Sequence, residues 1–439
     1  MALVHPVIVL PGITGTCLRD EYPMRPEFVW KVLKRDYERV ALHPNDLRYE
    51  AKEPARLRPG QINDVAYTEL VEELRYNLRT REDEAVPVYP FGYDWRMPLE
   101  VTETQLDEFI EEVIERTKLL RHYDKLGYCE DAKVNLVGHS MGGLVITGYL
   151  EHKGRSAPVN KVATLAAPYR GSFEAVIKVA TGTANLGTSP PSSREREAAR
   201  VTPSLYHLLP SFSGGVQSDP GIPRSLFNPG AWQPSVVDSI AEFIRLKGLP
   251  TKQRKRDARK LFAQLLADAR SHRARIDRFR LEDAGLNEDD WLAVVGVDAV
   301  TRVRLKIVKR GGVPDFDFSS DDRQNRWDPQ NPAHVRRLTG DGTLPFEGSV
   351  PAFLKKENLV CVTPDDFYYW ELQDRVFMKV AGFHGIMPNM NMLHRLLVRF
   401  FTGRPDRRGS TWGRRAPGVE NWRPPLGLRE KSQRCQVEG

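Results

Sequence analysis

The sequence predicts an α/β protein, in which a mostly parallel sheet carries helices on both faces. Short apolar runs that are typical of buried strands recur along the chain, at 4–10, 86–88, 134–137, 162–165, 291–297 and 376–380. Amphipathic patterns that are typical of helices separate several of these runs, at 65–78, 103–120 and 390–400. Strands that alternate with helices are characteristic of parallel sheets, because each helix returns the chain to the edge where the next strand begins.

Length and composition describe a globular chain with enough apolar residues for a sizeable core. Of the 439 residues, 40% are hydrophobic and 28% are charged, which is ordinary for a folded domain. No uncharged apolar run approaches the ~20 residues that a bilayer-spanning helix needs. The N-terminus lacks the basic segment and long apolar stretch of a signal peptide, so residues 4–10 are predicted to form a first strand.

The cysteines indicate a reducing environment. Cys17, Cys129, Cys361 and Cys435 are scattered, and they show neither a metal-ligand spacing nor the spacing of a disulfide framework. We therefore expect a cytoplasmic protein.

The alternation of strands and helices predicts where the domains begin and end. It covers residues 1–172 and 291–403, which we assign to the core. Residues 173–290 interrupt it with a Gly/Thr/Ser/Pro-rich loop (181–193) and two helix-like segments, at 236–247 and 252–280. This stretch is predicted to be an inserted, mainly helical cap or lid. Residues 404–439 are rich in Arg, Pro and Gly, and we expect a basic, flexible tail.

The net charge of +7 is concentrated in two segments. Residues 252–280 hold 11 Lys/Arg against 3 Asp, and residues 404–439 hold 9 Lys/Arg against 4 acidic residues. The first segment has an apolar face, which indicates either a cap helix with a solvated basic face or a helix that contacts anionic lipid. The second alternative would make the protein peripheral to a membrane. No nucleic-acid partner is expected, because the arginines lack interleaved aromatic residues and a known module.

The pattern Gly-x-Ser-x-Gly at 138–142 carries the main functional signal. It follows the strand-like run 134–137 and precedes a helix-like run at 144–150. A serine hydroxyl is a poor nucleophile unless it stands clear of the backbone beside a base, and a sharp strand–turn–helix connection provides that exposure. The flanking glycines let neighbouring backbone approach closely. Ser140 is therefore the candidate nucleophile, and the alternative is a glycine turn that only closes a strand.

Acyl transfer by serine requires a base to take its proton, an acid to orient the base, and donors for the oxyanion. In this class of fold the partners follow in the order serine, acid, histidine. His384 is the favoured base, because it lies in a glycine-flanked loop after the strand-like run 376–380. His394 lies within a helical pattern and is expected to be structural, and His334 has no preceding strand.

Two aspartates compete for the role of the acid. Asp341 lies in Gly-Asp-Gly-Thr, with flexible backbone on both sides, although Asp-Gly is also a common turn dipeptide. Asp298 directly follows the run 291–297, while Asp315 and Asp317 are weaker candidates in a polar loop. Sequence spacing alone leaves Asp341 and Asp298 nearly even.

Backbone amides are the expected oxyanion donors. The Met141 amide follows the nucleophile directly, and an early strand ends at Pro-Gly so that the amide of Ile13 or a neighbour can point into the site. A glycine-rich loop after a strand can also bind phosphate, but this loop lacks the Walker ending and the dinucleotide glycine spacing. No metal or organic cofactor is implied.

Together these segments resemble the lecithin:cholesterol acyltransferase family, which includes lysosomal phospholipase A2 and phospholipid:diacylglycerol acyltransferases. Among the matching motifs, Tyr-Asp-Trp-Arg and Gly-Asp-Gly-Thr-x-Pro are the most distinctive, and the set follows the family's order. The matching segments are Leu-Pro-Gly-Ile-Thr-Gly at 10–15, Gly-Tyr-Asp-Trp-Arg at 92–96, Gly-His-Ser-Met-Gly-Gly at 138–143, Ala-Ala-Pro-Tyr-Arg-Gly at 166–171, Ser-Leu-Tyr-His-Leu-Leu-Pro at 204–210, Gly-Asp-Gly-Thr-Leu-Pro at 340–345, and the segment around His384.

The resemblance implies an α/β-hydrolase core with a cap and lid. It implies Ser140 as nucleophile, His384 as base and Asp341, rather than Asp298, as acid. By the same matching, the amides of Ile13 and Met141 form the oxyanion hole.

The resemblance also implies a substrate-binding region. Tyr93, Asp94, Trp95 and Arg96 would border the acyl pocket, with Gly12 beside the nucleophile. The alternative for the first four is that an Asp94–Arg96 pair holds a turn while Trp95 packs in the core.

The implied function is that of a serine-dependent acyl-ester hydrolase or O-acyltransferase, which acts on lipid, phospholipid-like esters through an acyl-enzyme. Its partners would be the lipid or acyl-ester substrate and, for transfer, an acceptor alcohol. The alternatives are a lipase or esterase for non-phospholipid esters, an amidase, or an inactive hydrolase-fold module that binds lipid or protein.

Overall fold

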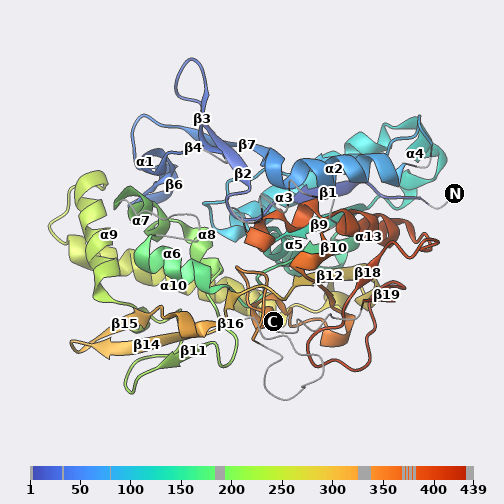
Figure 1. The fold of residues 1–439 in the computed structure, drawn as a ribbon. Coiled ribbons are helices and arrows are strands. Elements are labelled where there is room, and N and C mark those ends of the chain that lie inside the picture. The colour runs from blue at the N-terminus through green and yellow to red at the C-terminus, as the bar shows by residue number, and fades with distance from the viewer. Residues whose placement is uncertain are drawn as a thin grey trace.

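A six-stranded, wholly parallel sheet forms the centre of the molecule (Figure 1). The computed structural model describes residues 3–31, 34–79, 81–182, 193–324, 338–367, 371, 374, 378 and 382–431. The strand order is β17-β12-β10-β9-β1-β8, and every neighbouring pair is parallel. The strands are β1 (Val7–Leu10), β8 (Val88–Pro90), β9 (Val134–His139), β10 (Val159–Leu165), β12 (Trp291–Gly296) and β17 (Val360–Val362). The carboxyl ends of all six strands therefore lie along one edge.

Side chains on both faces of the sheet are buried. Along β1, Ile8 and Leu10 point into one apolar cluster, while Val7 and Val9 point into another. Because both faces are covered, the strands consist of continuous apolar runs and do not alternate with polar residues.

Helices cover the two faces, which confirms the predicted α/β class. On one face lie α2 (Asp64–Leu78) and α13 (Asn391–Thr402), and on the other lie α3 (Leu99–Lys118) and α5 (Met141–Lys153). The Asn63 side chain caps α2 by accepting a hydrogen bond from the Val65 amide. Two short helices, α4 (Arg121–Lys125) and α11 (Phe346–Ser349), lie in the connections.

An antiparallel segment after β1 was not predicted from the sequence. Its four-stranded sheet has the order β4-β3-β2-β7, and a short helix and a two-stranded sheet lie within the same segment. These elements are β2 (Thr16–Asp20), β3 (Glu27–Lys31), β4 (Lys34–Arg35), α1 (Tyr37–Val40), β5 (Leu42–His43), β6 (Asp46–Glu50) and β7 (Leu57–Ile62).

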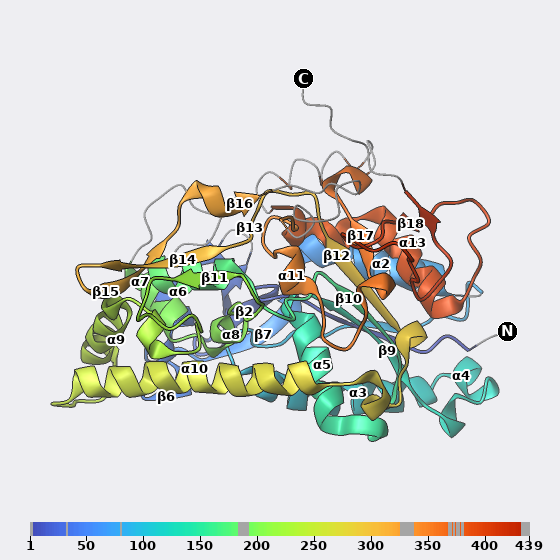
Figure 2. The ribbon, with the colours of Figure 1, turned by 90° about the horizontal axis from the view of Figure 1, so that it is seen from below.

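Helices dominate the stretch between β10 and β12, as the sequence predicts. They are α6 (Phe173–Thr181), α7 (Ser193–Arg200), α8 (Pro203–His207), α9 (Pro234–Lys247) and α10 (Arg254–Arg278). Figure 2 shows α10 as one long helix that runs past α8 towards α5. The expected loop at 181–193 lies almost wholly outside the described residues.

The burial of α10 favours one of its two interpretations. Its apolar residues, including Phe262, Leu265 and Leu266, are buried within the protein, while the basic residues near its N-terminal end are exposed. This is the pattern of a cap helix with a solvated Lys/Arg face. The apolar face is not available for insertion into lipid.

Further strands lie beside these helices. They are β11 (Val216–Ser218), β13 (Thr301–Arg302), β14 (Leu305–Arg310), β15 (Val313–Asp317) and β16 (Arg323–Gln324). Residues of the antiparallel segment also pack here: Ala41 and Leu42 share an apolar cluster with Val201 and Phe243. The elements beside the central sheet therefore come from three stretches of chain. These are the antiparallel segment after β1, the helical stretch between β10 and β12, and the strands that follow β12. The division into a core of residues 1–172 and 291–403 and a cap of residues 173–290 stays a prediction.

Residues 404–431, which were predicted to form a flexible tail, pack against the core in the structure. The backbone of Arg414 exchanges two hydrogen bonds with that of Cys361 in β17, at 2.9 and 3.0 Å. The Trp422 indole donates to the Leu359 carbonyl at 2.8 Å, and β18 (Trp412–Gly413) pairs with β19 (Arg429–Glu430). The tail therefore covers the outer edge of the sheet, which would otherwise expose unpaired backbone groups.

A buried carboxylate fixes this part of the tail. Asp366 accepts hydrogen bonds from the side chains of Arg414, Trp412 and Lys431 and from the Thr363 amide. Burial alone would raise the pKa of the Asp366 carboxyl, but Arg414 and the other donors hold it below its ordinary value of 3.8. The Asp366–Arg414 pair is thus charged at neutral pH.

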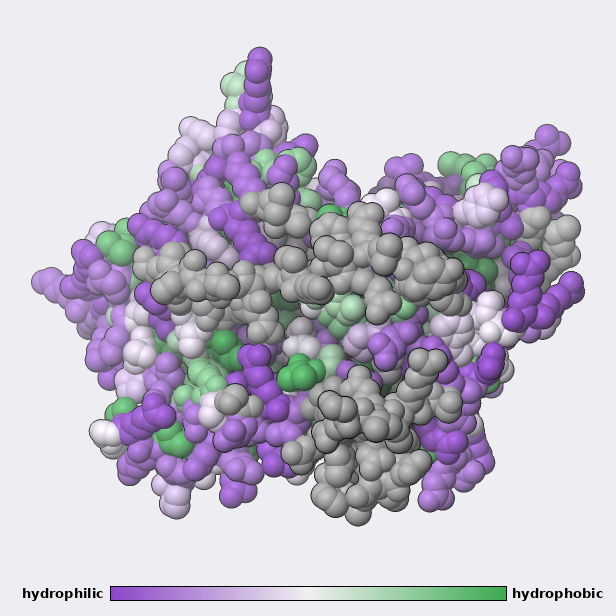
Figure 3. Space-filling view, viewed as in Figure 1, coloured by the Kyte–Doolittle hydropathy of each residue, from purple (hydrophilic) through white to green (hydrophobic). Residues whose placement is uncertain are grey.

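The described residues contain no helix that is both long and apolar enough to cross a membrane. The face drawn in Figure 3 is largely hydrophilic, and hydrophobic side chains gather left of its centre, over the region where Figure 1 labels α6.

We predict that Arg414→Ala lowers the free energy of unfolding by about 3 kcal/mol at pH 7, because it leaves the buried Asp366 carboxylate without its main cation. Because the folded pKa of Asp366 lies below the unfolded value, this contribution is present above about pH 4 and is lost as the pH falls through the folded pKa. Urea unfolding at several pH values measures it.

The neighbouring Arg415 provides the matched control. Its pair with Glu430 is exposed, so Arg415→Ala is expected to cost less than about 1 kcal/mol. Equal losses in the two variants would show that the buried pair does not anchor the tail.

Candidate active site

Ser140 stands in a strained turn between β9 and α5, as the sequence predicts. Its φ of 52° and ψ of −125° lie outside the regions that a serine ordinarily adopts. The Ser140 amide donates to the Leu165 carbonyl of β10 at 2.8 Å, which continues the sheet hydrogen bonding into the turn. A Cβ at Gly138 would lie 2.8 Å from the Gly143 nitrogen, so the turn requires glycine there.

Ser140, His384 and Asp341 form one hydrogen-bonded line. His384 Nε2 lies 2.9 Å from Ser140 Oγ, and His384 Nδ1 lies 2.7 Å from Asp341 Oδ2. A carboxylate only accepts hydrogen bonds, so Nδ1 carries the proton and Nε2 presents its lone pair to the serine hydroxyl. The exposed fractions are 5% for Ser140, 8% for His384 and 0% for Asp341. This arrangement can abstract a proton from the serine when Oγ attacks an acyl carbon.

Backbone donors hold the Asp341 carboxylate in place. Its Oδ1 accepts hydrogen bonds from the amides of Thr343, at 2.9 Å, and Leu344, at 2.6 Å. The rival Asp298 lies in the turn after β12 with a φ of 66°, and the next amide, that of Ala299, donates to the Gly340 carbonyl. The Asp298 turn therefore supports the loop that carries Asp341, and it is Asp341 that contacts His384.

His384 reaches the site from a helical turn, which corrects the expected loop. Residues 382–386 are helical, and the His384 amide donates to the Asp341 carbonyl at 3.2 Å. The strand expected at 376–380 lies outside the described residues except for Met378, which is helical. Among the described residues, the last strand of the sheet is β17, which the sequence analysis missed. His394 is buried in α13 with Nε2 2.6 Å from the Pro388 carbonyl, which suits the expected structural role.

Two backbone amides next to Ser140 remain available. Among the described residues, no acceptor takes the N–H of Ile13 or of Met141. Met141 is the first residue of α5, where the helix dipole is positive. Gly12 lies against the nucleophile: a Cβ at this position would be 2.8 Å from the Ser140 Cβ. The Gly12 amide is already engaged by Tyr67 Oη at 2.9 Å, so Gly12 provides close approach and not a free donor.

A second histidine connects the parts of the site. His139 Nδ1 lies 2.7 Å from Tyr67 Oη, and His139 Nε2 lies 3.0 Å from the His384 carbonyl. That carbonyl can only accept, so Nε2 carries the proton and Nδ1 accepts from the tyrosine. Burial lowers the pKa of His139 well below 6.5, so the ring is neutral. No sequence pattern marked Tyr67 beyond its predicted helix, and His139 stood out only as part of the serine motif.

The Tyr-Asp-Trp-Arg motif at 93–96 makes contacts that hold the segment around Gly12 and Ile13. Arg96 is fully buried, and its guanidinium contacts both oxygens of Asp94, at 2.9 and 2.7 Å, and Glu50 at 3.0 Å. Tyr93 Oη donates to the Pro11 carbonyl at 2.7 Å, and the Trp95 indole donates to the Thr16 carbonyl at 3.2 Å.

The side chains of Tyr93, Asp94, Trp95 and Arg96 make protein contacts, and their substrate contacts stay a prediction. All four residues are at most 8% exposed. Protein groups occupy their hydrogen-bonding atoms, and these contacts hold the loop that carries Gly12 and Ile13. The alternative of an ion pair with a packed tryptophan agrees with the structure.

A parallel sheet that carries a serine–histidine–aspartate line at its carboxyl edge defines the α/β-hydrolase class. Within it, a family model described as lecithin:cholesterol acyltransferase matches residues 56–227. The family resemblance that the motifs predicted is confirmed over this segment. The segment includes Ser140 and ends before Asp341 and His384. It supports acyl-ester chemistry on lipids as the general class of activity.

Similar proteins add support for the fold. A chain of the Tle4-Tli4 complex superimposes with a TM-score of 0.54 at 16% identity, over 80% of this chain and 89% of that chain. Phospholipase PlaB from Legionella pneumophila is a weak likeness, with a TM-score of 0.22 at 12% identity, over 45% of this chain and 32% of that one.

One curated relative is Uncharacterized protein YJR098C from Saccharomyces cerevisiae, 27% identical over 144 residues. The match covers 32% of this chain and about one fifth (20%) of the relative's length.

We predict that Tyr67→Phe slows reaction at Ser140 about tenfold or more and destabilises the fold by about 1–3 kcal/mol, because it leaves the Gly12 amide and His139 Nδ1 without partners. The rate of Ser140 modification by a fluorophosphonate and the thermal unfolding midpoint measure the two effects.

Tyr76→Phe is the control, since Tyr76 lies on the same helix and is 63% exposed. If both variants retained the wild-type modification rate, Tyr67 would have no part in positioning the site.

Proposed function

We propose that this protein is a serine-dependent acyl-ester hydrolase or O-acyltransferase, which acts on lipid, phospholipid-like esters through an acyl-enzyme. The observation that carries the proposal is the line of hydrogen bonds from Ser140 Oγ through His384 to Asp341, at 2.9 and 2.7 Å. Three residues that lie far apart in the sequence meet here in the geometry that serine acyl transfer requires. Their order along the chain is that of α/β-hydrolases.

In the proposed reaction, His384 Nε2 takes the proton from Ser140 Oγ as the oxygen attacks the carbonyl carbon of the ester. The Asp341 carboxylate keeps the proton on Nδ1 and stabilises the imidazolium that forms. His384 then returns its proton to the departing alcohol, and the acyl group remains on Ser140. A second nucleophile, deprotonated by His384, releases the acyl group and regenerates the serine.

The amides of Ile13 and Met141 are the proposed oxyanion donors. Both lie within one residue of the contact between Gly12 and Ser140, and neither has a partner among the described residues. An oxyanion would also gain from the positive end of the α5 dipole. Loss of one such donor typically costs a factor of about 10²–10³ in rate.

The lipid substrate is supported by the family match and not by a pocket. The match to the lecithin:cholesterol acyltransferase model covers the serine motif, which suits the first half-reaction shared by hydrolysis and transfer. The two outcomes differ only in whether water or an alcohol reaches the acyl-enzyme. Ser140 is 5% exposed, so little of the residue is open to solvent. The helical stretch between β10 and β12 is the proposed lid.

We predict that Ser140→Ala lowers turnover of phospholipid vesicles by about 10⁶-fold, and that Asp341→Asn lowers it by about 10⁴-fold, because the amide holds the wrong imidazole tautomer. Asp298→Asn is the matched control for the acid and is expected to retain turnover, since asparagine tolerates the positive φ at this position.

Lipid mass spectrometry with and without a long-chain alcohol identifies the products. Free fatty acid indicates hydrolysis, and a new ester that appears only with the alcohol indicates transfer. Undiminished turnover by Ser140→Ala, or absence of turnover by the wild type on phospholipids, triacylglycerols and short esters alike, would overturn the proposal.

A further inference from the structure

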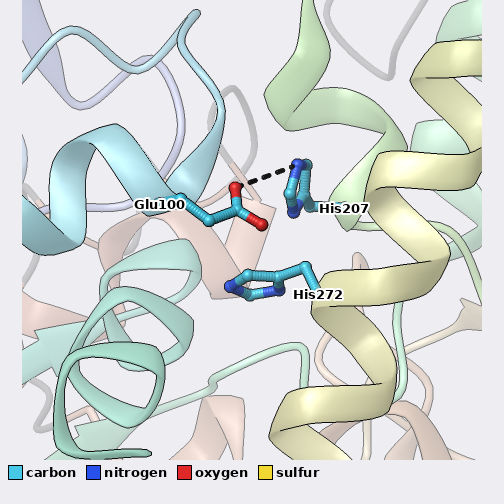
Figure 4. A group of neighbouring side chains, drawn as sticks. All are labelled: Glu100, His207 and His272. Carbon is cyan, nitrogen blue, oxygen red and sulfur yellow. Dashed lines mark ion pairs between the residues drawn. The ribbon is translucent and has the colours of Figure 1, made fainter. Parts of the chain in front are cut away.

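A second group of chemistry-bearing side chains lies away from Ser140, between α3, α8 and α10 (Figure 4). Glu100 is at the start of α3, His207 ends α8, and His272 lies in α10. One ligand-type atom from each residue lies within 4.8 Å of the others. Figure 4 shows the Glu100 carboxylate directed towards the two imidazole rings.

A neighbouring carboxylate orients His272. Its Nε2 lies 2.7 Å from Glu103 Oε1, and Glu103 also accepts from Arg275 at 2.9 Å. An ionised carboxylate only accepts, so Nε2 carries the proton and Nδ1 keeps its lone pair. A histidine that binds a metal usually donates its other ring N–H to a carboxylate in this way.

His207 has a ring nitrogen that the protein leaves without a partner. Its side chain is 1% exposed, and Nδ1 is buried with no hydrogen bond. Nε2 lies 4.0 Å from Glu100 Oε2, which is too long for a hydrogen bond. A buried polar atom without a partner costs free energy and requires an explanation.

Two nearby arginines make their shorter contacts with other groups, although Arg275 Nη2 also lies 3.8 Å from Glu100 Oε1. Arg275 contacts Glu151 at 2.7 Å as well as Glu103, and Arg273 donates to the His207 carbonyl at 2.7 Å.

We propose that Glu100, His207 and His272 bind a divalent transition metal ion, for which Zn²⁺ is the best match. Two imidazole nitrogens and a carboxylate oxygen are a common zinc ligand set, with water in the fourth position. Ligand atoms about 2.0 Å from a tetrahedral ion lie about 3.3 Å apart. The three ligand atoms lie within 4.8 Å of one another, so binding would draw them closer together. The Glu100 side chain is 43% exposed, so solvent can reach the open position.

The ion joins two layers of the molecule. It links α3, which packs on the central sheet, to α8 and α10 of the helical stretch between β10 and β12. Because a ligand that binds only the folded state stabilises it, the ion would raise the unfolding temperature and hold the helical stretch against the sheet. This inference does not depend on the proposed acyl-ester chemistry.

The test uses the full-length protein after chelation and dialysis. Calorimetric titration with Zn²⁺ is expected to give one ion per chain, and Co²⁺ in its place is expected to give the visible absorption of a four-coordinate nitrogen–oxygen site. Zn²⁺ is also expected to raise the wild-type Tm. Glu100→Gln should bind Zn²⁺ at least about tenfold more weakly.

Glu108→Gln, an exposed charge change on the same helix, should bind Zn²⁺ as the wild type does. His272→Asn should remove the Co²⁺ spectrum, and its circular dichroism reports whether it folds. Absence of saturable binding by the wild type, or equal affinity of Glu100→Gln and Glu108→Gln, would overturn the proposal whether or not the histidine variant folds.

Discussion

The parallel arrangement of the central strands is the constraint on which the site depends. Because β1, β9 and β12 run in the same direction, the chain leaves all three at one edge of the sheet. The loop with Gly12, the nucleophile and the turn that supports Asp341 follow these three ends. A single antiparallel reversal among them would carry one component to the opposite edge. Sheet direction, rather than any local motif, therefore brings together residues separated by more than two hundred positions.

The polar groups at this edge are shielded from solvent, so they must form hydrogen bonds with one another. Tyr67, His139, His384 and Asp341 are almost fully buried, and each must be hydrogen bonded within the protein. The chain of contacts from the Gly12 amide through Tyr67 and His139 to the His384 carbonyl links the oxyanion loop to the base. Removal of one member leaves a buried partner unsatisfied on the other side, so stability and reactivity at this edge are coupled.

The sequence predicted the parts of the fold that local pattern encodes. Continuous apolar runs revealed β1, β9, β10 and β12, and the serine motif with its flanking strand and helix revealed the turn at Ser140. The run that forms β17 has only three residues, and the polar, Pro-containing antiparallel strands before residue 62 lack a clear period. Asp341 and Asp298 could not be separated by spacing, because the contact to His384 spans 43 residues. The packing of the tail was not predicted for a similar reason. Its composition is typical of disordered segments, but Trp412 and Arg414 donate hydrogen bonds to the buried Asp366, and no local pattern reveals this contact.

The basic helix α10 shows how much charge alone can mislead about partners. Its N-terminal arginines and lysines are exposed to solvent. Near its other end, Arg273 donates to the His207 carbonyl and Arg275 donates to the Glu103 carboxylate. Glu103 meets both His272 and Arg275 there, and it presses so closely on α5 that a Cβ at Gly148 would lie 1.9 Å from its Oε1. The helix that begins beside Ser140 is thus in contact with the carboxylate that orients the cap histidine. Any displacement of α10 must therefore break buried charged contacts on the flank of α5, and this energetic cost opposes movement of the cap.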